Sequence, residues 1–202
     1  MHKLPDPSSF GRLAGTLLLL AGLAGTARGQ AIDPVRACVV KAGLLLNFLR
    51  YTDWPAAENT SGPLVVAFAG GDTIAIYLEE IIARERIGDP PRAVEIRHLP
   101  PWPKVASPAD SAAFLMGCRH ARMLYIGHPY AEQIPWILEE LSGSAVLTVS
   151  DVPGFASRGG MLGLVPREGG LAFEANPAAI ERQRLHFSSK ALRLARIVAE
   201  IP

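Results

Sequence analysis

Residues 63–82 read PLVVAFAGGDTIAIYLEEII, and this stretch decides the fold class. The run from Pro63 to Ala69 is apolar without alternation, which predicts a strand buried on both faces. A Gly-Gly-Asp-Thr turn follows, in which Asp72 is the expected N-cap of a helix whose apolar residues recur at helical spacing. Residues 121–141, ARMLYIGHPYAEQIPWILEEL, repeat the same plan of strand, turn and helix. Buried strands that alternate with helices predict a mostly parallel sheet with helices on both faces.

Further strands and a long helix extend this plan toward both ends. Residues 144–149 form a third apolar run that ends at Ser150-Asp151, and residues 93–97 predict a short extra strand. Asp33-Pro34 has the pattern of an N-cap with proline at the first helical position, so we expect a mostly buried helix to about Tyr51. The proline-rich stretch from Pro90 to Pro108 is expected to be a loop or surface crossover.

The C-terminal part predicts a different unit. Apolar runs at 161–165 and 171–174, separated by Arg-Glu-Gly-Gly, indicate a β-hairpin. Asn176-Pro177 should open a short helical turn, and Ser188 or Ser189 should cap a final helix that continues through Ile201. The fold class is therefore α/β, a single three-layer domain with a mostly parallel sheet, flanking helices and a C-terminal β-hairpin plus helix.

The first 29 residues have the layout of a secretory signal peptide. Lys3 and Arg12 precede an apolar run from Leu13 to Ala24, and small residues stand three and one before Gln30. The run is short for a membrane helix, which needs about 20 apolar residues. We therefore expect residues 1–29 to be removed and residues 30–202 to form the exported, periplasmic domain.

Charge and cysteine content exclude two classes of protein. The net charge of +1 offers no basic surface for nucleic acid. The two cysteines, Cys38 and Cys118, are too few for a disulfide scaffold. If the first helix runs antiparallel to the strands, the two thiols lie at opposite ends, so we expect no bridge between them.

No motif of the chain predicts catalysis or metal binding. The histidines have no zinc spacing, and Gly70-Gly71-Asp72 lacks the rest of a dinucleotide or P-loop fingerprint. Ser188-Ser189-Lys190 is explained by helix capping better than by a serine nucleophile. We therefore expect no metal, no cofactor and no enzyme activity.

The candidate binding residues lie after the third buried strand. In open α/β sheets, ligands bind at the carboxyl ends of the strands, and Asp151 stands there. A turn cap explains Asp151 equally well, because Val152-Pro153-Gly154 follows it. Trp102, within Pro100–Pro103, is a candidate partner contact that could also fold back onto its own domain. The partner- or ligand-binding candidates are Asp151, Pro153, Phe155, Gly159, Gly160 and Trp102.

Two blocks of the sequence resemble a known family. The first is VKAGLLLNFLRYTDWP at 40–55, and the second is VLTVSDVPGF at 146–155. Shorter matches lie at 124–127, 159–161, 173–176 and 188–192. In this order and spacing they resemble the YfiR-like periplasmic regulators over roughly residues 38–200.

This resemblance implies an inhibitor that binds a membrane protein. YfiR-like proteins bind the periplasmic domain of an inner-membrane diguanylate cyclase, and relatives occur near other membrane sensors. The resemblance also implies a homodimer and release by an outer-membrane lipoprotein. The well-known members carry a disulfide near the turn after the second block, whereas residues 155–163 contain no cysteine here. The rival functions are a periplasmic small-ligand binding protein and a small hydrolase that uses Ser189 or Asp151.

Export with cleavage before Gln30 is directly testable. N-terminal sequencing of the periplasmic protein should begin at Gln30, because the small residues Ala27 and Gly29 suit the signal peptidase. A mature protein that still carries Met1 would contradict this prediction.

Overall fold

A computed structural model describes residues 33–55, 62–83, 85–88, 91–102, 107–168 and 170–200. The signal-peptide prediction for residues 1–29 lies outside these residues. Among them, no helix combines the length and the apolar character needed to span a bilayer.

The center of the fold is a sheet of seven strands in the order β3-β2-β4-β5-β6-β7-β9. The first five strands in this order are mutually parallel, β6 and β7 form an antiparallel hairpin, and β9 pairs with β7 in parallel. The predicted mostly parallel sheet and the hairpin are thus confirmed. The strands of this sheet are β2 (Leu64–Ala69), β3 (Val94–His98), β4 (Met123–Ile126), β5 (Leu147–Ser150), β6 (Leu162–Arg167), β7 (Gly170–Ala175) and β9 (Arg196–Ile197).

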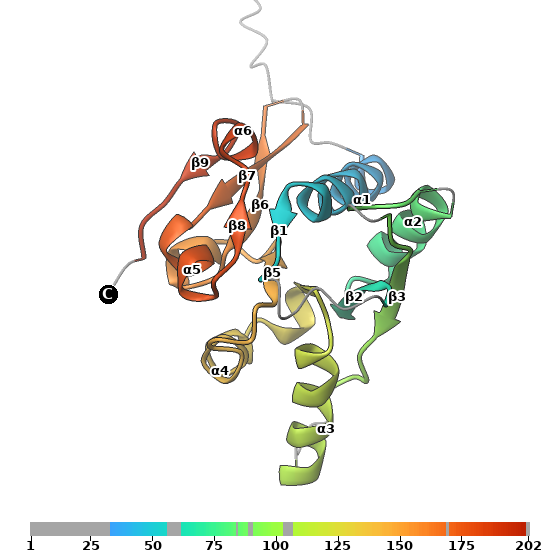
Figure 1. Cartoon of the computed structure of the whole chain (residues 1–202), viewed down its shortest axis with the longest axis vertical. Helices are drawn as coiled ribbons and strands as arrows, with labels where there is room; N and C mark the ends of the chain where they lie inside the picture. Colours follow the sequence, from blue (N-terminus) through green and yellow to red (C-terminus); the bar gives the residue numbers. More distant parts are fainter. Residues whose placement is uncertain are drawn as a thin grey trace, which may run out of the picture.

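Helices cover both faces of this sheet, which gives the predicted three layers (Figure 1). One face packs against α1, α2, α5 and α6, and the other packs against α3 and α4. A separate antiparallel pair, β1 (Thr52–Asp53) and β8 (His186–Phe187), joins the end of α1 to the C-terminal part. The helices are α1 (Pro34–Arg50), α2 (Asp72–Ile82), α3 (Pro108–Arg119), α4 (Ile134–Glu140), α5 (Pro177–Arg182) and α6 (Ser189–Leu192).

Capping residues set the helix starts, with one correction. The Asp33 carboxylate accepts a hydrogen bond from the Arg36 N–H at 3.0 Å, so the predicted start of α1 is confirmed. In α2, however, Gly71 is the N-cap and Asp72 is the first helical residue. The left-handed φ of 82° at Gly71 explains the shift, because glycine takes this conformation without a steric penalty.

Two segments differ from the sequence-based expectation. Helix α3 begins at the end of the proline-rich stretch, where Ser107 and Asp110 form a capping box. The final helix is shorter than predicted, because α6 ends at Leu192 and the chain turns into β9. The open edge of β7 accounts for this second difference. The Val198 N–H donates a hydrogen bond to the Ala175 carbonyl oxygen at 2.9 Å, so pairing along β7 replaces helical hydrogen bonding here.

The two cysteines are free and lie on opposite faces of the sheet. Cys38 packs at the margin of the core on the α1 side, and Cys118, on the inner side of α3, is fully buried. Burial raises the pKa of the Cys118 thiol to about 12. The expectation that they do not bridge is confirmed.

Phe155 is one of the largest fully buried side chains in the core beneath α3 and α4. A Cβ atom at Gly160 would lie only 2.2 Å from the Phe155 ring, so glycine is required where the chain crosses it. The segment after β5 is therefore held by packing.

Phe155→Ala should lower the free energy of unfolding by about 3–5 kcal/mol, because truncation of a buried phenylalanine leaves a cavity. Urea unfolding measures this loss. Met116→Ala is the control, since Met116 is exposed on α3 and its truncation should change stability by less than about 0.5 kcal/mol. A loss below about 1 kcal/mol for Phe155→Ala would contradict the prediction.

Candidate functional site

The connections that leave the neighboring strands β2 and β4 create a crevice beyond the carboxyl ends of these strands. From β2 the chain passes over one face of the sheet through α2 to β3, whereas from β4 it passes over the other face through α4 to β5. The connections that leave the two neighboring strands therefore diverge. Such a topological switch point is where open α/β sheets bind their ligands.

A cavity of about 360 Å³ lies at this switch point. Its size is within the usual range of small-molecule sites, about 300–1,000 Å³. Loops after β2, β4 and β5 form it together with one side of α1. The lining residues are Cys38, Lys41, Gly71, Asp72, Thr73, Ile74, Tyr125, Gly127, His128, Pro129 and Asp151.

An ion pair between α1 and the end of β5 forms one wall. Lys41 Nζ lies 2.5 Å from Asp151 Oδ2, and the two side chains are 17% and 13% exposed. Charges this far from water interact more strongly than surface charges do. The pair therefore ties α1 to the sheet at the mouth of the cavity.

Asp151 does not cap the turn that follows it. Ser150 does so, because its hydroxyl donates to the Ile126 carbonyl oxygen at 2.6 Å and accepts the Val152 N–H at 3.0 Å. The Asp151 carboxylate is thus free of this structural role and faces the cavity.

The other oxygen of Asp151, Oδ1, is buried and has no hydrogen-bond partner among the described residues. The His128 Nε2 atom is 4.0 Å away, beyond hydrogen-bond distance. Burial, and then the negative charge of Asp151, raise the pKa of Tyr125, so its phenol stays protonated beside the carboxylate. An unpaired buried acceptor next to a cavity is the arrangement that a hydrogen-bond donor on a ligand would satisfy.

The glycine turn at the cavity has a packing explanation. Gly70 and Gly71 both have left-handed φ angles, and a Cβ at Gly71 would lie 2.5 Å from the Tyr125 ring. Asp72 is exposed and lies 3.2 Å from His98 Nδ1. These contacts support the interpretation of Gly70-Gly71-Asp72 as a tight turn.

The remaining candidates after β5 are not gathered around Asp151. Phe155 and Gly160 are buried against each other, and Pro153 is exposed. Gly159, with a left-handed φ of 94°, faces a different cavity.

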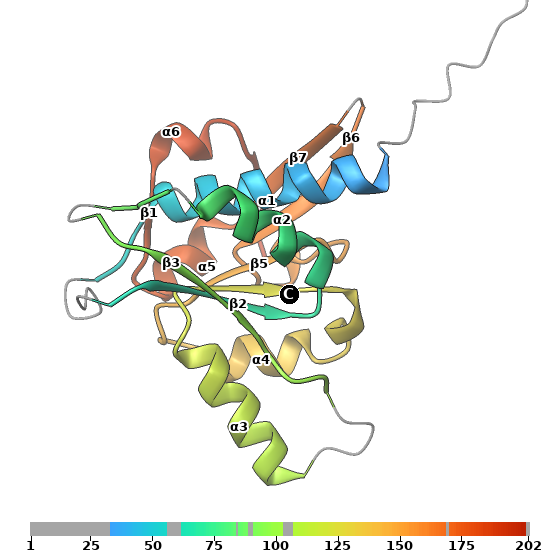
Figure 2. The same cartoon turned by 90° about the vertical axis from the view of Figure 1, so that its right-hand side faces the viewer.

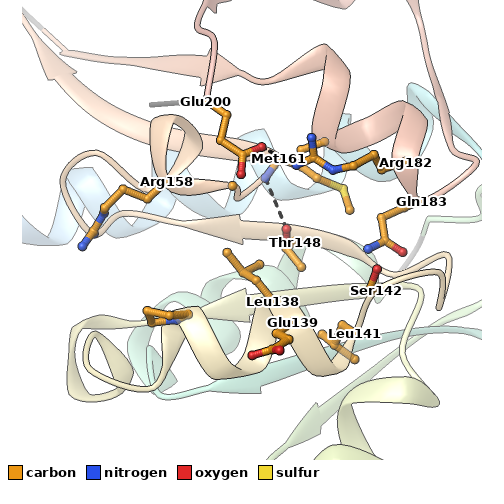
Figure 3. Close-up of a pocket in the computed structure, with 13 residues that line it drawn as sticks. Leu138, Glu139, Leu141, Ser142, Thr148, Arg158, Met161, Arg182, Gln183 and Glu200 are labelled. Carbon is orange, nitrogen blue, oxygen red and sulfur yellow. Dashed lines mark hydrogen bonds and ion pairs between the residues drawn. The ribbon is translucent and has the colours of Figure 1, made fainter. Parts of the chain in front are cut away.

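This second cavity, of about 350 Å³, lies between α4, α5 and the C-terminal segment (Figure 3). Arg182 and Glu200 form an ion pair of 2.6 Å at its edge, and the Met161 N–H donates to Thr148 Oγ1 at 3.3 Å across its floor. The Gln183 side-chain oxygen is buried there without a partner among the described residues. The cavity is polar but lies away from the switch point.

Trp102 folds back onto its own domain. Its ring contacts those of Phe114 and Trp136 edge-on, at centroid distances of 5.2 and 5.1 Å. Of the two alternatives for Trp102, the structure shows the second, because aromatic packing under α3 and α4 provides a partly buried position for the indole.

The described residues assemble neither a metal site nor a hydrolase site around Ser189 and Asp151. They contain no cluster of three or more His, Cys, Asp or Glu side chains that could hold a metal. The Ser188 hydroxyl accepts the Lys190 N–H, which is the capping role, and Ser189 lines a cavity that does not include Asp151.

Sequence reasoning missed Lys41, Tyr125 and His128, because they come from α1, the end of β4 and the loop after it. One signal was available for Lys41. It lies on the opposite side of α1 from the polar stripe of Arg36, Asn47 and Arg50, so its charge faces inward.

Comparisons with known proteins give one family and one fold. The model of the family described as YfiR/HmsC-like matches residues 39–196. No curated protein matches. Among solved structures, the ABC domain from Streptococcus pneumoniae in complex with L-Trp has a TM-score of 0.51 and 11% identity. The match covers 80% of this chain and 60% of that one, so the chain spans less than two thirds of it, and the likeness shows the fold alone.

Lys41→Met should lower the free energy of unfolding by about 2–4 kcal/mol, because it leaves the Asp151 charge unpaired in a mostly buried position. Chemical denaturation measures the loss, and the Lys41→Met/Asp151→Asn double variant should recover part of it. The matched control is Arg50→Met. Its pair with Glu85 is about 40% exposed, and its removal should cost less than about 1 kcal/mol. Equal small losses for both lysine and arginine variants would contradict the prediction.

Proposed function

This chain belongs to the YfiR/HmsC-like family, and from that premise we propose that it is a periplasmic regulator that binds and inhibits a membrane signaling protein. The target is the periplasmic part of an inner-membrane diguanylate cyclase or a comparable sensor. The observation that carries the proposal is the family match across nearly the whole described domain, residues 39–196.

An exposed apolar stripe on α1 supports a protein partner. Ala42, Leu45 and Leu49 form the buried stripe of this helix. The same stripe continues toward the N-terminus through Val35 and Val39, which are 56% and 42% exposed. Apolar side chains grouped on a surface are typical of protein interaction sites.

The position of this stripe makes it accessible to a partner. Figure 2 shows that the start of α1 and the far ends of β6 and β7 project on the same side of the molecule. At these ends Val165 and Leu171 are only partly buried. We define Val35, Val39, Val165 and Leu171 as the α1 surface and assign the partner contact to it.

The finer parts of the proposal are a homodimer and release by an outer-membrane lipoprotein. A second exposed apolar region supports a protein contact in addition to the one with the membrane partner. Leu194, just before β9, and Ile197, within β9, are exposed, and β9 is the last strand of the sheet order. A strand at the edge of a sheet presents backbone groups that can pair with another chain. We therefore assign the contact between two copies to β9.

A second candidate function, periplasmic small-ligand binding, is favored by the cavity at the switch point. Its volume and its unpaired Asp151 oxygen suit a small molecule. The two functions are compatible, because α1 contributes to both the cavity and the α1 surface.

The partner proposal is tested by cyclase inhibition. Membranes that carry an inner-membrane diguanylate cyclase from the same organism, expressed as the candidate target, should make less cyclic-di-GMP when the purified protein is added. Val39→Asp should weaken binding about tenfold or more with an unchanged melting temperature, because a charge disrupts an apolar contact.

Met116→Asp is the matched control. It places the same charge on an exposed apolar residue of α3, on the other face of the sheet, and should inhibit like the wild type. Full inhibition by Val39→Asp would remove the α1 surface from the interface. No effect of the wild-type protein on the cyclase would overturn the proposed target.

A further inference from the structure

The switch-point cavity has an excess of negative charge. Two carboxylates, Asp72 and Asp151, line it against the single ammonium group of Lys41, beside the imidazole of His128. Although the first turn of α2 also lines the cavity, Asp72 already places a carboxylate at this helix N-terminus. A bound anion would meet both acids, so the charge distribution favors a cation.

The Asp151 carboxylate already accepts a hydrogen bond from one ammonium group. Its Oδ2 atom binds the Lys41 ammonium at 2.5 Å, while Oδ1 is buried and unpartnered among the described residues. A carboxylate offers about four acceptor positions, so a second donor can be accommodated. The Tyr125 phenol also lies beside this carboxylate, and the His128 imidazole, 4.0 Å from Oδ1, is 63% exposed and free to move aside.

We propose that this cavity binds a small primary amine, whose ammonium group donates a hydrogen bond to Asp151 Oδ1. Apolar parts of Ile74, Pro129 and the Tyr125 ring line the same space and would contact the carbon skeleton. At about 360 Å³ the cavity holds a short aliphatic chain or a small ring. The proposal does not depend on the α1 surface or on the identity of the membrane partner.

Putrescine is the probe, and 1,4-butanediol is its matched control, with the same carbon chain and hydroxyl groups in place of the ammonium groups. Isothermal titration calorimetry with the full mature chain should show binding of putrescine and at least about tenfold weaker binding of the diol, because charge-assisted hydrogen bonds are the stronger ones.

Variants of the ion pair separate a ligand site from a structural role. Asp151→Asn should weaken putrescine binding about tenfold or more. Lys41→Met should instead bind putrescine more tightly than the wild type, because it frees the second oxygen of Asp151. Putrescine should also raise the melting temperature of Lys41→Met more than that of the wild type. A purely structural ion pair would give no such opposite effects.

Asp53→Asn is the control for a general loss of negative charge, because Asp53 is exposed beside β8 and does not line this cavity. It should bind putrescine like the wild type. If Asp151→Asn does not fold, Lys41→Met and the comparison of diamine with diol decide the matter.

Three results would each overturn the proposal. One is no measurable binding of putrescine to the wild type at millimolar concentration. Another is equal binding of putrescine and butanediol. The third is Lys41→Met protein that folds but binds putrescine more weakly than the wild type. Because these measurements use the isolated protein, they stand apart from the cyclase inhibition assay.

Discussion

Burial of the central strands on both faces is the constraint on which the rest of the structure depends. Every residue of β2, β4 and β5 is buried. Apolar strands of this kind are stable only when helices cover both faces of the sheet. The chain meets the requirement by sending α2, which follows β2, to one face and α4, which follows β4, to the other. The connections of β2 and β4 then diverge, and the crevice between their ends follows from the same arrangement that buries the sheet.

Helix α1 links the two surfaces to which we assign function. Its second half is core, where Leu45, Phe48 and Leu49 pack on the sheet. Its first half leaves Val35 and Val39 exposed, while Cys38 and Lys41 line the cavity. The Lys41–Asp151 pair fixes this half of the helix to the end of β5. A ligand that changes the pairing of Asp151 therefore acts next to the side chains proposed to contact the partner.

The second block that resembles the family, residues 146–155, combines two roles together with the short match at 159–161. Ser150 caps the turn, Phe155 fills the core, and Gly160 gives the Phe155 ring space, so these residues are explained by folding. Asp151, between them, has no such backbone role and faces the cavity. Likeness in sequence across this block thus reports mainly on structure, and the site residue has to be identified by its contacts.

The sequence by itself determined the fold class, because runs such as Leu64–Ala69 and the helix caps at Asp33 and Asn176 act through local burial and hydrogen bonding. It also placed Asp151 at the end of a buried strand. The short α6 and the strand β9 were decided by tertiary structure, since helical spacing in residues 188–201 competes with pairing along β7, which lies more than 20 residues earlier in the sequence. The cavity was likewise decided only in three dimensions. Lys41, Tyr125 and Asp151 lie on three separate elements, and no local pattern records that sheet topology brings them together.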